Sequence, residues 1–566
     1  MQHNLLEFRN MFIEYLRKYF TSKDIKENSD KSTILHAVAD QGYSDYVEFF
    51  VDLDRSRINS KDCIRRTPLH LASIKGHKSV VEKLIERKAF FDVPDNEGNT
   101  PLHLACAGGH VETVIVLLSN KAAVKQNPYT LATALHLVCN SGHKTLAALL
   151  LDKNADTNVC NDKGLTPLLL SSRKGHTSIC KLLLDHAVYV NYIGPKCKTP
   201  LYYACENNHL DTVKLLLERN ANLTLDSDER KTPFLIACEK GHKQIVKELM
   251  KFNAKINRHD VNGNSSLYLA AMNGHTDIVR MLLINNADLN LSNNASNFPI
   301  HAACHHGHLS VLKCLLEYKA DINCVNKDKE TSLHAACQAG HIDIAKVLLE
   351  YTVHVSSEEF QKQTPLNMKD KYGRSPLRIA CENNYKRIVA LLLDYEADTN
   401  SRDNDGLQIL HMTCRDGFVD IVRSLLDNNA NVNSTDNDLW TPLFFACKEN
   451  NVEITQLLIE KNAVVNQPNK DGDTPLHQAS TSGNELITDL LVTKGANINQ
   501  KNTLGETPLW KCAINGHKTL TRYFLQHGAD PEIVDRFGTS LETHVRKSDD
   551  KELIDLLSSN ECETAV

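Results

Sequence analysis

The chain is long and nearly neutral, with 566 residues, 42% of them hydrophobic and 24% charged, and a formal net charge of −6. This balance argues against a nucleic-acid partner, because proteins that neutralise phosphates carry strongly basic surfaces. The apolar runs, such as residues 388–393, are far shorter than the ~20 residues that a membrane-spanning helix needs. Charged residues interrupt the N-terminus, which therefore does not resemble a secretory signal. We expect a cytoplasmic protein without an integral membrane segment, and association with the membrane cytoskeleton stays open.

Residues 1–32 form the first expected segment, an amphipathic helix followed by a polar loop. Between residues 4 and 20, apolar side chains alternate with charged ones at helical spacing. Terminal repeats of a stacked array need a cap, so we interpret this helix as the cap of the repeats that begin at residue 33. The alternative is a helix that binds a membrane surface or a partner.

From residue 33 onward, the sequence repeats a phrase that is clearest at residues 67–72, TPLHLA. The phrase occurs sixteen times, and twelve of the fifteen steps between copies are 33 residues. The copies open at residues 33, 67, 100, 133, 166, 199, 232, 265, 298, 331, 375, 408, 441, 474, 507 and 539. A fixed period of this length indicates a stack of small helical units.

Each unit is predicted to contain two short helices and a projecting loop. In the copy at residues 62–96, Thr67 can cap the first helix, Pro68 suits its first turn, and Gly76 suits its left-handed C-terminus. A second helix follows around residues 80–87. Positions 17 and 18 after the opening residue are apolar in every copy, so this pair should face the core. The loop that closes the unit is rich in Asn, Asp and Gly, as turns require.

These features resemble the ankyrin-repeat family. The TPLHxA signature, the Gly76-His77 pair and turns such as residues 320–323 all match it. The resemblance covers residues 33–558 and implies an all-α solenoid of about sixteen repeats, with a concave groove lined by first helices and hairpin loops. We expect repeats 1–10 at residues 33–351 and repeats 11–16, including a charged C-terminal cap, at residues 375–558.

Two further segments lie outside the regular pattern. The 44-residue step between 331 and 375 predicts an enlarged loop at residues 352–374, either a groove-side contact or a hinge. The tail, residues 559–566, ends in Glu563, Thr564, Ala565 and Val566. This ending resembles the C-terminal ligands of PDZ domains, which pair with a sheet edge and bury the free carboxylate among backbone N–H groups.

Cysteine and histidine follow the repeat. Nine of the 17 cysteines fall six residues after the opening residue, which predicts buried, reduced thiols. Eighteen of the 26 histidines occupy positions 3 or 10, where ankyrin-like units use them as framework residues. His305 and His306 are exceptions, and their neighbourhood is dense enough in His and Cys to suggest zinc, but the framework residues around them point apart. We expect no metal, no cofactor and no catalytic residue, because no nucleophile, Walker or dinucleotide motif is present.

The chain is therefore predicted to be a non-catalytic scaffold or adaptor that binds protein partners, as a monomeric rod. The alternative is a regulatory or substrate-recruiting subunit of a phosphatase or a ubiquitin ligase. Partner specificity should lie at positions 7 and 8 of each repeat and in the loops. The candidate contact residues are Arg173, Glu206, Glu239, Met272, His305, His306, Tyr372, Glu382, Arg415, Trp440 and Lys448. For Trp440 and Tyr372, packing within the loop is the alternative to an exposed anchor. Asn323 resembles the turn asparagines that asparaginyl hydroxylase modifies in ankyrin arrays, or is simply a structural turn residue.

Overall fold

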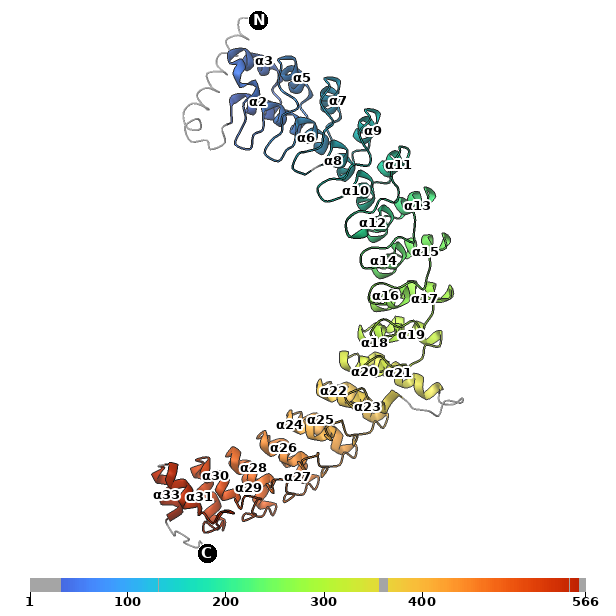
Figure 1. Cartoon of the computed structure of the whole chain (residues 1–566). Helices are drawn as coiled ribbons and strands as arrows, with labels where there is room; N and C mark the ends of the chain where they lie inside the picture. The colour runs from blue at the N-terminus through green and yellow to red at the C-terminus, as the bar shows by residue number, and fades with distance from the viewer. Residues whose placement is uncertain (1–31, 131, 356–364, 549, 559–566) are drawn as a thin grey trace, which may run out of the picture. The chain divides into compact units, whose positions relative to one another are not determined.

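The computed structural model describes residues 32–130, 132–355, 365–548 and 550–558. The predicted N-terminal helix and the C-terminal tail lie outside these residues. The chain divides into two compact units, Met1–Ser266 and Leu267–Val566. In each unit the described residues form a series of helix pairs, as predicted (Figure 1). Even-numbered labels mark the first helix of a pair and odd-numbered labels the second. The only β structure in the described part consists of isolated bridges at hairpin bases.

The helices of the first unit are short and regular in length. The first helices are α2 Ile34–Gln41, α4 Pro68–Lys75, α6 Pro101–Gly108, α8 Ala134–Ser141, α10 Pro167–Lys174, α12 Pro200–Glu206 and α14 Pro233–Lys240. The second helices are α3 Ser44–Leu53, α5 Lys78–Glu86, α7 Val111–Ser119, α9 Lys144–Asp152, α11 Thr177–Leu184, α13 Leu210–Glu218 and α15 Lys243–Lys251. Two 3-10 helices, η1 Arg55–Asn59 and η2 Pro195–Cys197, lie in the loops.

The second unit continues the pattern, with α16 starting at the boundary. Its first helices are α16 Ser266–Met272, α18 Pro299–His305, α20 Ser332–Ala339, α22 Pro376–Glu382, α24 Ile409–Arg415, α26 Pro442–Lys448, α28 Pro475–Ser482, α30 Pro508–Ile514 and α32 Leu541–Val545. Its second helices are α17 Thr276–Ile284, α19 Leu309–Glu317, α21 Ile342–Val355, α23 Lys386–Asp394, α25 Val419–Asp427, α27 Val452–Glu460, α29 Glu485–Thr493, α31 Lys518–Gln526 and α33 Lys551–Ser558. The 3-10 helices are η3 Pro365–Asn367 and η4 Arg546–Ser548.

The first helices begin and end where the sequence predicts. Thr100 caps α6, its hydroxyl accepting the N–H of His103, while the Nδ1 atom of His103 accepts the Thr100 N–H at 3.1 Å. We number positions in each repeat from this capping residue, as position 0. Gly109, at position 9, has a φ of +79° and ends the helix in the left-handed conformation. A Cβ atom there would lie 2.4 Å from the ring of His143 in the next repeat, so glycine also permits the close stacking.

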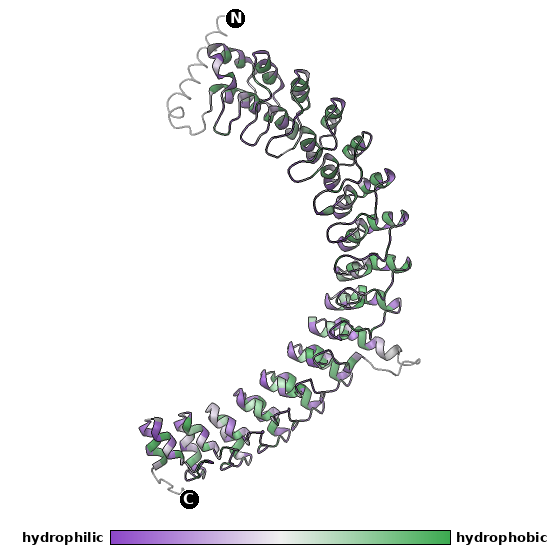
Figure 2. Ribbon diagram, in the orientation of Figure 1, coloured by the Kyte–Doolittle hydropathy of each residue, from purple (hydrophilic) through white to green (hydrophobic). Residues whose placement is uncertain are grey.

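The core lies between the paired helices and between successive pairs, and Figure 2 shows hydrophobic and hydrophilic residues together in each helix, as amphipathic helices require. Position 17 is fully buried in most repeats, as at Leu84 and Leu117, whereas position 18 is only partly buried in several, as at Ile85. The predicted cysteine row at position 6 is buried throughout, and every described cysteine is a free thiol. Burial raises the pKa of the Cys106 thiol to about 12, so these thiols stay protonated and unreactive.

Three rows of hydrogen bonds join successive repeats. At position 3, the Nε2 atom of His70 contacts the Asn99 carbonyl of the next hairpin at 3.2 Å. At position 10, the Nε2 atom of His110 contacts the Ile74 carbonyl of the preceding repeat at 2.7 Å. In the third row, an Asn or Asp eight residues before the capping residue uses its side-chain oxygen to accept a backbone N–H of the next repeat. The donor residue lies 31 positions further along the chain. This last row contains Asn59, Asp92, Asn158, Asn191, Asn367, Asn400, Asn433, Asn466 and Asn499.

The predicted loop at residues 352–374 is partly wrong, because α21 continues to Val355. In most repeats the residue at position 21 has a positive φ that ends the second helix, as at Lys319 and Asn286. Thr352 takes this position in the repeat that opens at 331, and a β-branched residue is strained at positive φ, so the helix runs on. The insertion therefore extends the second helix as far as Val355. Residues 356–364 lie outside the described residues, and the groove-side contact or hinge expected there stays a prediction. The hairpin that follows at residues 370–374 has the regular turn, in which Asp370 accepts the N–H groups of Tyr372 and Arg374.

The last repeat opens one residue later than predicted. Ser540, not Thr539, caps α32, and its side chain accepts the N–H of Thr543. Thr539 instead closes the preceding hairpin, where its N–H donates to Asp535 at 2.8 Å. The final step between repeats is thus 33 residues, like its neighbours.

Candidate interaction surface

The first helices and the hairpins of each unit lie on the same side, and the second helices form the other side (Figure 1). We call the first side the groove face. It is lined by positions 4 and 7 of the first helix and by positions −1 and −3 of the hairpin that precedes it. All the predicted contact residues except His306 and the hairpin residues Tyr372 and Trp440 occupy position 7.

In the first unit, the acidic candidates are paired with the hairpin of their own repeat. Lys198, at position −1, lies 2.8 Å from the carboxylate of Glu206 at position 7. Lys231 and Glu239 form the same pair one repeat later, also at 2.8 Å. Lys198 also lies over the rings of Tyr202 and Tyr203, at 4.9 and 5.7 Å. These pairs span the groove face of each repeat and hold both side chains in place.

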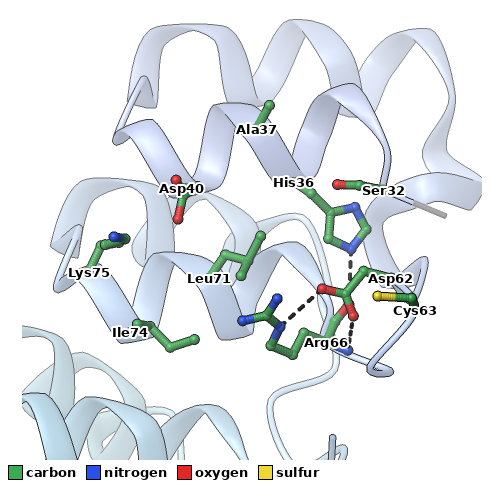
Figure 3. Close-up of a pocket in the computed structure, with 10 residues that line it drawn as sticks. All are labelled: Ser32, His36, Ala37, Asp40, Asp62, Cys63, Arg66, Leu71, Ile74 and Lys75. Carbon is green, nitrogen blue, oxygen red and sulfur yellow. Dashed lines mark hydrogen bonds and ion pairs between the residues drawn. The ribbon is translucent and has the colours of Figure 1, made fainter. Parts of the chain in front are cut away.

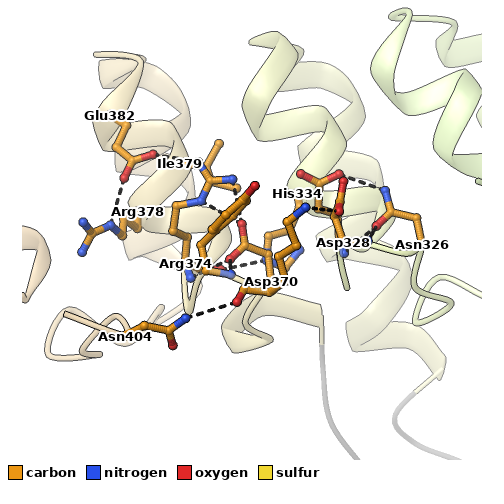
Figure 4. Close-up of polar contacts among 12 residues, drawn as sticks. Asn326, Asp328, His334, Asp370, Arg374, Arg378, Ile379, Glu382 and Asn404 are labelled. Carbon is orange, nitrogen blue, oxygen red and sulfur yellow. Dashed lines mark hydrogen bonds and ion pairs between the residues drawn. The ribbon is translucent and has the colours of Figure 1, made fainter. Parts of the chain in front are cut away.

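The same pairing recurs after the insertion, with a third member. Arg374 lies 3.3 Å from Glu382, and Arg378 contacts the same carboxylate at 2.9 Å (Figure 4). Arg378 occupies position 3, where many repeats have histidine, and donates to the Leu407 carbonyl at 3.1 Å as those histidines do. It also lies 2.8 Å from Asp403. This arginine therefore combines the histidine's framework bond with two ion pairs.

Trp440 is half-buried and packs within its own repeat, and its role as an anchor for a partner stays a prediction. Its ring packs on Phe444 and Phe445, with centroids 4.6 and 5.3 Å apart. The ammonium group of Lys448 lies 4.6 Å from the same ring. Trp440 occupies position −1, like Lys198, and Lys448 occupies position 7, like Glu206. The same two positions therefore meet in both repeats, here as a cation beside an aromatic ring.

Tyr372 and Arg173 remain accessible. Tyr372 is 52% exposed at a hairpin tip, with Lys371 and Arg374 at 4.8 and 5.0 Å from its ring. Arg173 is exposed at the end of α10, and its carbonyl accepts the Nε2 proton of His209.

Two other position 7 candidates also lie on the groove face. Arg415, at the end of α24, is exposed and pairs with Asp416 at 3.0 Å. Met272 is partly buried at the end of α16.

His305 and His306 are both exposed at the end of α18 and pack edge-to-face, with ring centroids 5.1 Å apart. The ring of His306 also stacks on His308 at 6.3 Å. Partial burial and the nearby histidines hold the pKa of His306 below its ordinary value. In the described part of the chain no group of three His, Cys, Asp or Glu side chains could hold a metal ion. The polar contact patch predicted at His305 and His306 stays a prediction.

A recess that sequence analysis did not predict lies on the groove face of the first two repeats (Figure 3). It has a volume of about 400 Å³ and is bordered by positions 4 and 7 of α2 and α4. Asp62 anchors its hairpin side, where it pairs with Arg66 at 3.0 Å, and His36 contacts the Arg66 carbonyl at 2.9 Å. Both contacts belong to the repeat framework.

The matches to known families agree with this geometry. A model of three consecutive ankyrin repeats matches residues 6–95, 35–128, 88–159, 135–227, 222–293, 285–359, 358–436 and 410–502. A single-repeat model matches residues 504–536. The chain is an ankyrin-repeat protein. A comparison with curated proteins gave no match. Ankyrin repeats are a protein–protein interaction module and are typically non-catalytic, and no enzyme domain was found among the family matches. Among the described residues, no helix has the length and apolar character needed to cross a membrane.

Asn323 belongs to the asparagine row but has lost its partner. Its Oδ1 atom is buried and has no hydrogen-bond partner among the described residues. The residue 31 positions on lies inside α21, so its N–H is used within that helix. The insertion thus interrupts the row at one repeat. Whether Asn323 is hydroxylated stays a prediction.

Sequence analysis missed Arg378 and the hairpin carboxylates around it, Glu330, Asp403 and Asp405. The signal for Arg378 was present, since a charged residue stands at a position that is His, Leu or aromatic in most other repeats. The predicted PDZ ligand, Glu563, Thr564, Ala565 and Val566, lies outside the described residues and stays a prediction.

Proposed function

We propose that this ankyrin-repeat protein is a cytoplasmic, non-catalytic scaffold that binds protein partners on its groove face. The observation that carries the proposal is the contrast between framework and groove positions. Position 0 is Thr or Ser and position 9 is Gly or Asn in nearly every repeat, whereas position 7 changes between apolar, amide, cationic and anionic side chains. A constant framework that presents changing side chains is suited to binding one partner or several with specificity.

The preformed pairs on this face support the same proposal. Lys198 with Glu206, Lys231 with Glu239 and Lys448 with Trp440 hold long side chains in one geometry before any partner arrives. A partner then meets a preorganised surface and loses less conformational entropy on binding.

The test is affinity capture of the full-length protein, compared with a groove variant and a matched variant of the opposite side. The groove variant carries alanine at Arg173, Met272, His305 and Arg415. The control carries alanine at four exposed positions of second helices, Glu112, Lys144, Lys346 and Glu453. We expect captured partners to be lost from the groove variant and kept by the control. Equal capture by both variants would contradict a groove-face interaction, and a stoichiometric enzyme among the partners would favour a regulatory subunit.

A further inference from the structure

A recess of about 590 Å³ opens on the groove face of the second unit, beside the exposed ring of Tyr372. Its walls come from three successive hairpins, those that precede α20, α22 and α24, and from α20 and α22 themselves. The volume is within the ~300–1,000 Å³ of sites that hold a small organic group. It is large enough to receive a side chain from a partner.

The two arginines in the recess are already neutralised. Arg374 lies 2.7 Å from Asp370, whose side chain is fully buried. The side chain of Arg378 is 10% exposed and pairs with Asp403, which is 7% exposed, and with Glu382. An anionic ligand would have to displace these carboxylates, so the arginines act as a fixed wall (Figure 4).

Two carboxylates of the recess, Glu330 and Asp405, form no salt bridge among the described residues, although the charge of Glu330 also acts on Arg374. Glu330 accepts a single amide hydrogen bond, from Asn326 at 2.9 Å, and Asp405 is exposed at its hairpin tip. Asp328, at the tip of the hairpin that also contains Glu330, pairs with Lys371. Four carboxylates and two guanidinium groups line the recess, a formal balance of −2. The rim therefore attracts a cation.

We propose that this recess binds an arginine side chain presented by an extended segment of a protein partner. A guanidinium group is planar and can donate two parallel hydrogen bonds to a carboxylate such as Glu330 or Asp405. It can also stack on the exposed ring of Tyr372 in exchange for Lys371 or Arg374, which lie 4.8 and 5.0 Å from that ring. A lysine offers a point charge without the planar match. The proposal rests on the groove-face function above and names the chemistry of its partner.

The hairpin tips beyond the recess extend the pattern. Asp405, Asp438 and Asp471 occupy position −3 in three successive repeats, and Asp438 pairs with Lys470 at 3.0 Å, a lysine that a partner's cation would have to displace. Stacked helix layers lie ~8–10 Å apart, and an extended chain advances ~3.3 Å per residue, so three residues of the partner span one repeat. The partner segment is expected to carry a basic residue at every third position, with an arginine at the recess.

The test uses fluorescein-labelled peptides of about twelve residues in a Gly-Ser background, and the full-length protein. One peptide has arginine at every third position, a second has the same arginines in one run, and two others replace arginine by lysine or glutamate. Fluorescence anisotropy at low salt should show saturable binding of the spaced arginine peptide, weaker binding of the lysine peptide and no binding of the glutamate peptide. Binding should weaken as salt screens the charges.

Two protein variants locate the binding site. E330Q/D405N should weaken binding of the spaced arginine peptide at least about fivefold. The control E453Q/E460Q removes the same charge from α27 on the opposite side and should change it less than about twofold. Tyr372→Ala should weaken binding, and Tyr372→Phe should keep it. Far-UV circular dichroism confirms that the variants fold.

Several outcomes would overturn the proposal. One is that the wild-type protein shows no saturable peptide binding. Another is that E330Q/D405N and its control lose peptide binding equally, or that neither loses it. Equal affinity for the spaced and contiguous peptides would overturn the three-residue spacing. If E330Q/D405N still captures the partners that the wild-type protein captures and the peptides do not bind, the arginine site is wrong while the groove-face function stands.

Discussion

Lowering the pH from 7.0 to 5.5 should loosen the repeat that contains His136. Its Nδ1 atom accepts the backbone N–H of Thr133 at 3.0 Å, and its Nε2 atom donates to the Leu165 carbonyl at 3.0 Å. The ring is therefore neutral, and a second proton would have to enter at an occupied acceptor. Burial lowers the pKa of His136 to about 4 from 6.5, while its carbonyl contacts oppose the shift.

The sign and size of the effect follow from linkage. The folded pKa of His136 is lowered, so its contribution to stability is present above the unfolded pKa of about 6.5 and is lost as the pH falls towards 4. The full loss is about 3 kcal/mol. Between pH 7.0 and 5.5 it is roughly 1.2 kcal/mol, equivalent to an eightfold rise in the open population. Most carboxylates stay ionised in this window, so the change comes mainly from histidines, and the His136→Leu variant separates the contribution of His136 from that of the other buried histidines.

Hydrogen exchange, corrected for the pH dependence of intrinsic rates, measures this opening. Amide protection in α8 and α9 should fall roughly eightfold between pH 7.0 and 5.5. In His136→Leu the fall should disappear, because leucine occupies the same position in other repeats, as at Leu169 and Leu235. α14, with Leu235 at position 3, is the internal control. Protection in α8 that stays constant in the wild-type protein, or falls equally in the variant, would refute the reasoning.

Three more predictions concern the repeat framework. Asn400→Ala should cost about 1–2 kcal/mol in urea unfolding, because it leaves the N–H of the next repeat without its acceptor, whereas Asn323→Ala should cost less than about 0.5 kcal/mol, since its Oδ1 atom has no partner to lose. A larger loss for Asn323 would contradict the interrupted row. Gly109→Ala should destabilise by more than about 1 kcal/mol, through strain at positive φ and collision with the next histidine ring, and a thermal melt measures it. Iodoacetamide should alkylate exposed Cys63 within minutes and spare buried Cys205 until denaturant is added, as peptide mass spectrometry can show.

Much of the fold could be predicted from the sequence because each framework residue acts locally. Thr100 caps the N-terminus of α6, the His103 side chain accepts the N–H of Thr100, and Gly109 ends the helix, all within ten consecutive residues. The same logic, applied to Thr352, could have predicted the extension of α21, since a β-branched residue stands where most other repeats have Asn, Lys or Gly. Nothing at this position favours the positive φ that ends the second helix elsewhere, so α21 continues to Val355.

The contacts of the groove face were harder to predict. Lys198 and Glu206 are eight residues apart, one in a hairpin and one at the end of a helix, and only the folded repeat shows that they meet. Trp440 follows the same rule, because its place at position −1 sets it over Phe444 and beside Lys448. Periodicity gives the position of a residue in the repeat, whereas the length and shape of its side chain decide what it reaches.

The direction of the bonds between repeats has a consequence for shortened versions of the array. In the asparagine row and the position 10 histidine row, the donor lies in the later repeat and the acceptor in the earlier one, as with Phe90 and Asn59 or His110 and Ile74. A fragment cut from the middle would therefore expose N–H groups from these two rows at its leading end and oxygen atoms at its trailing end, while the position 3 histidine row, whose donor lies in the earlier repeat, would leave carbonyl groups at the leading end. Such ends complement each other, and the fragment would be prone to join head to tail into filaments.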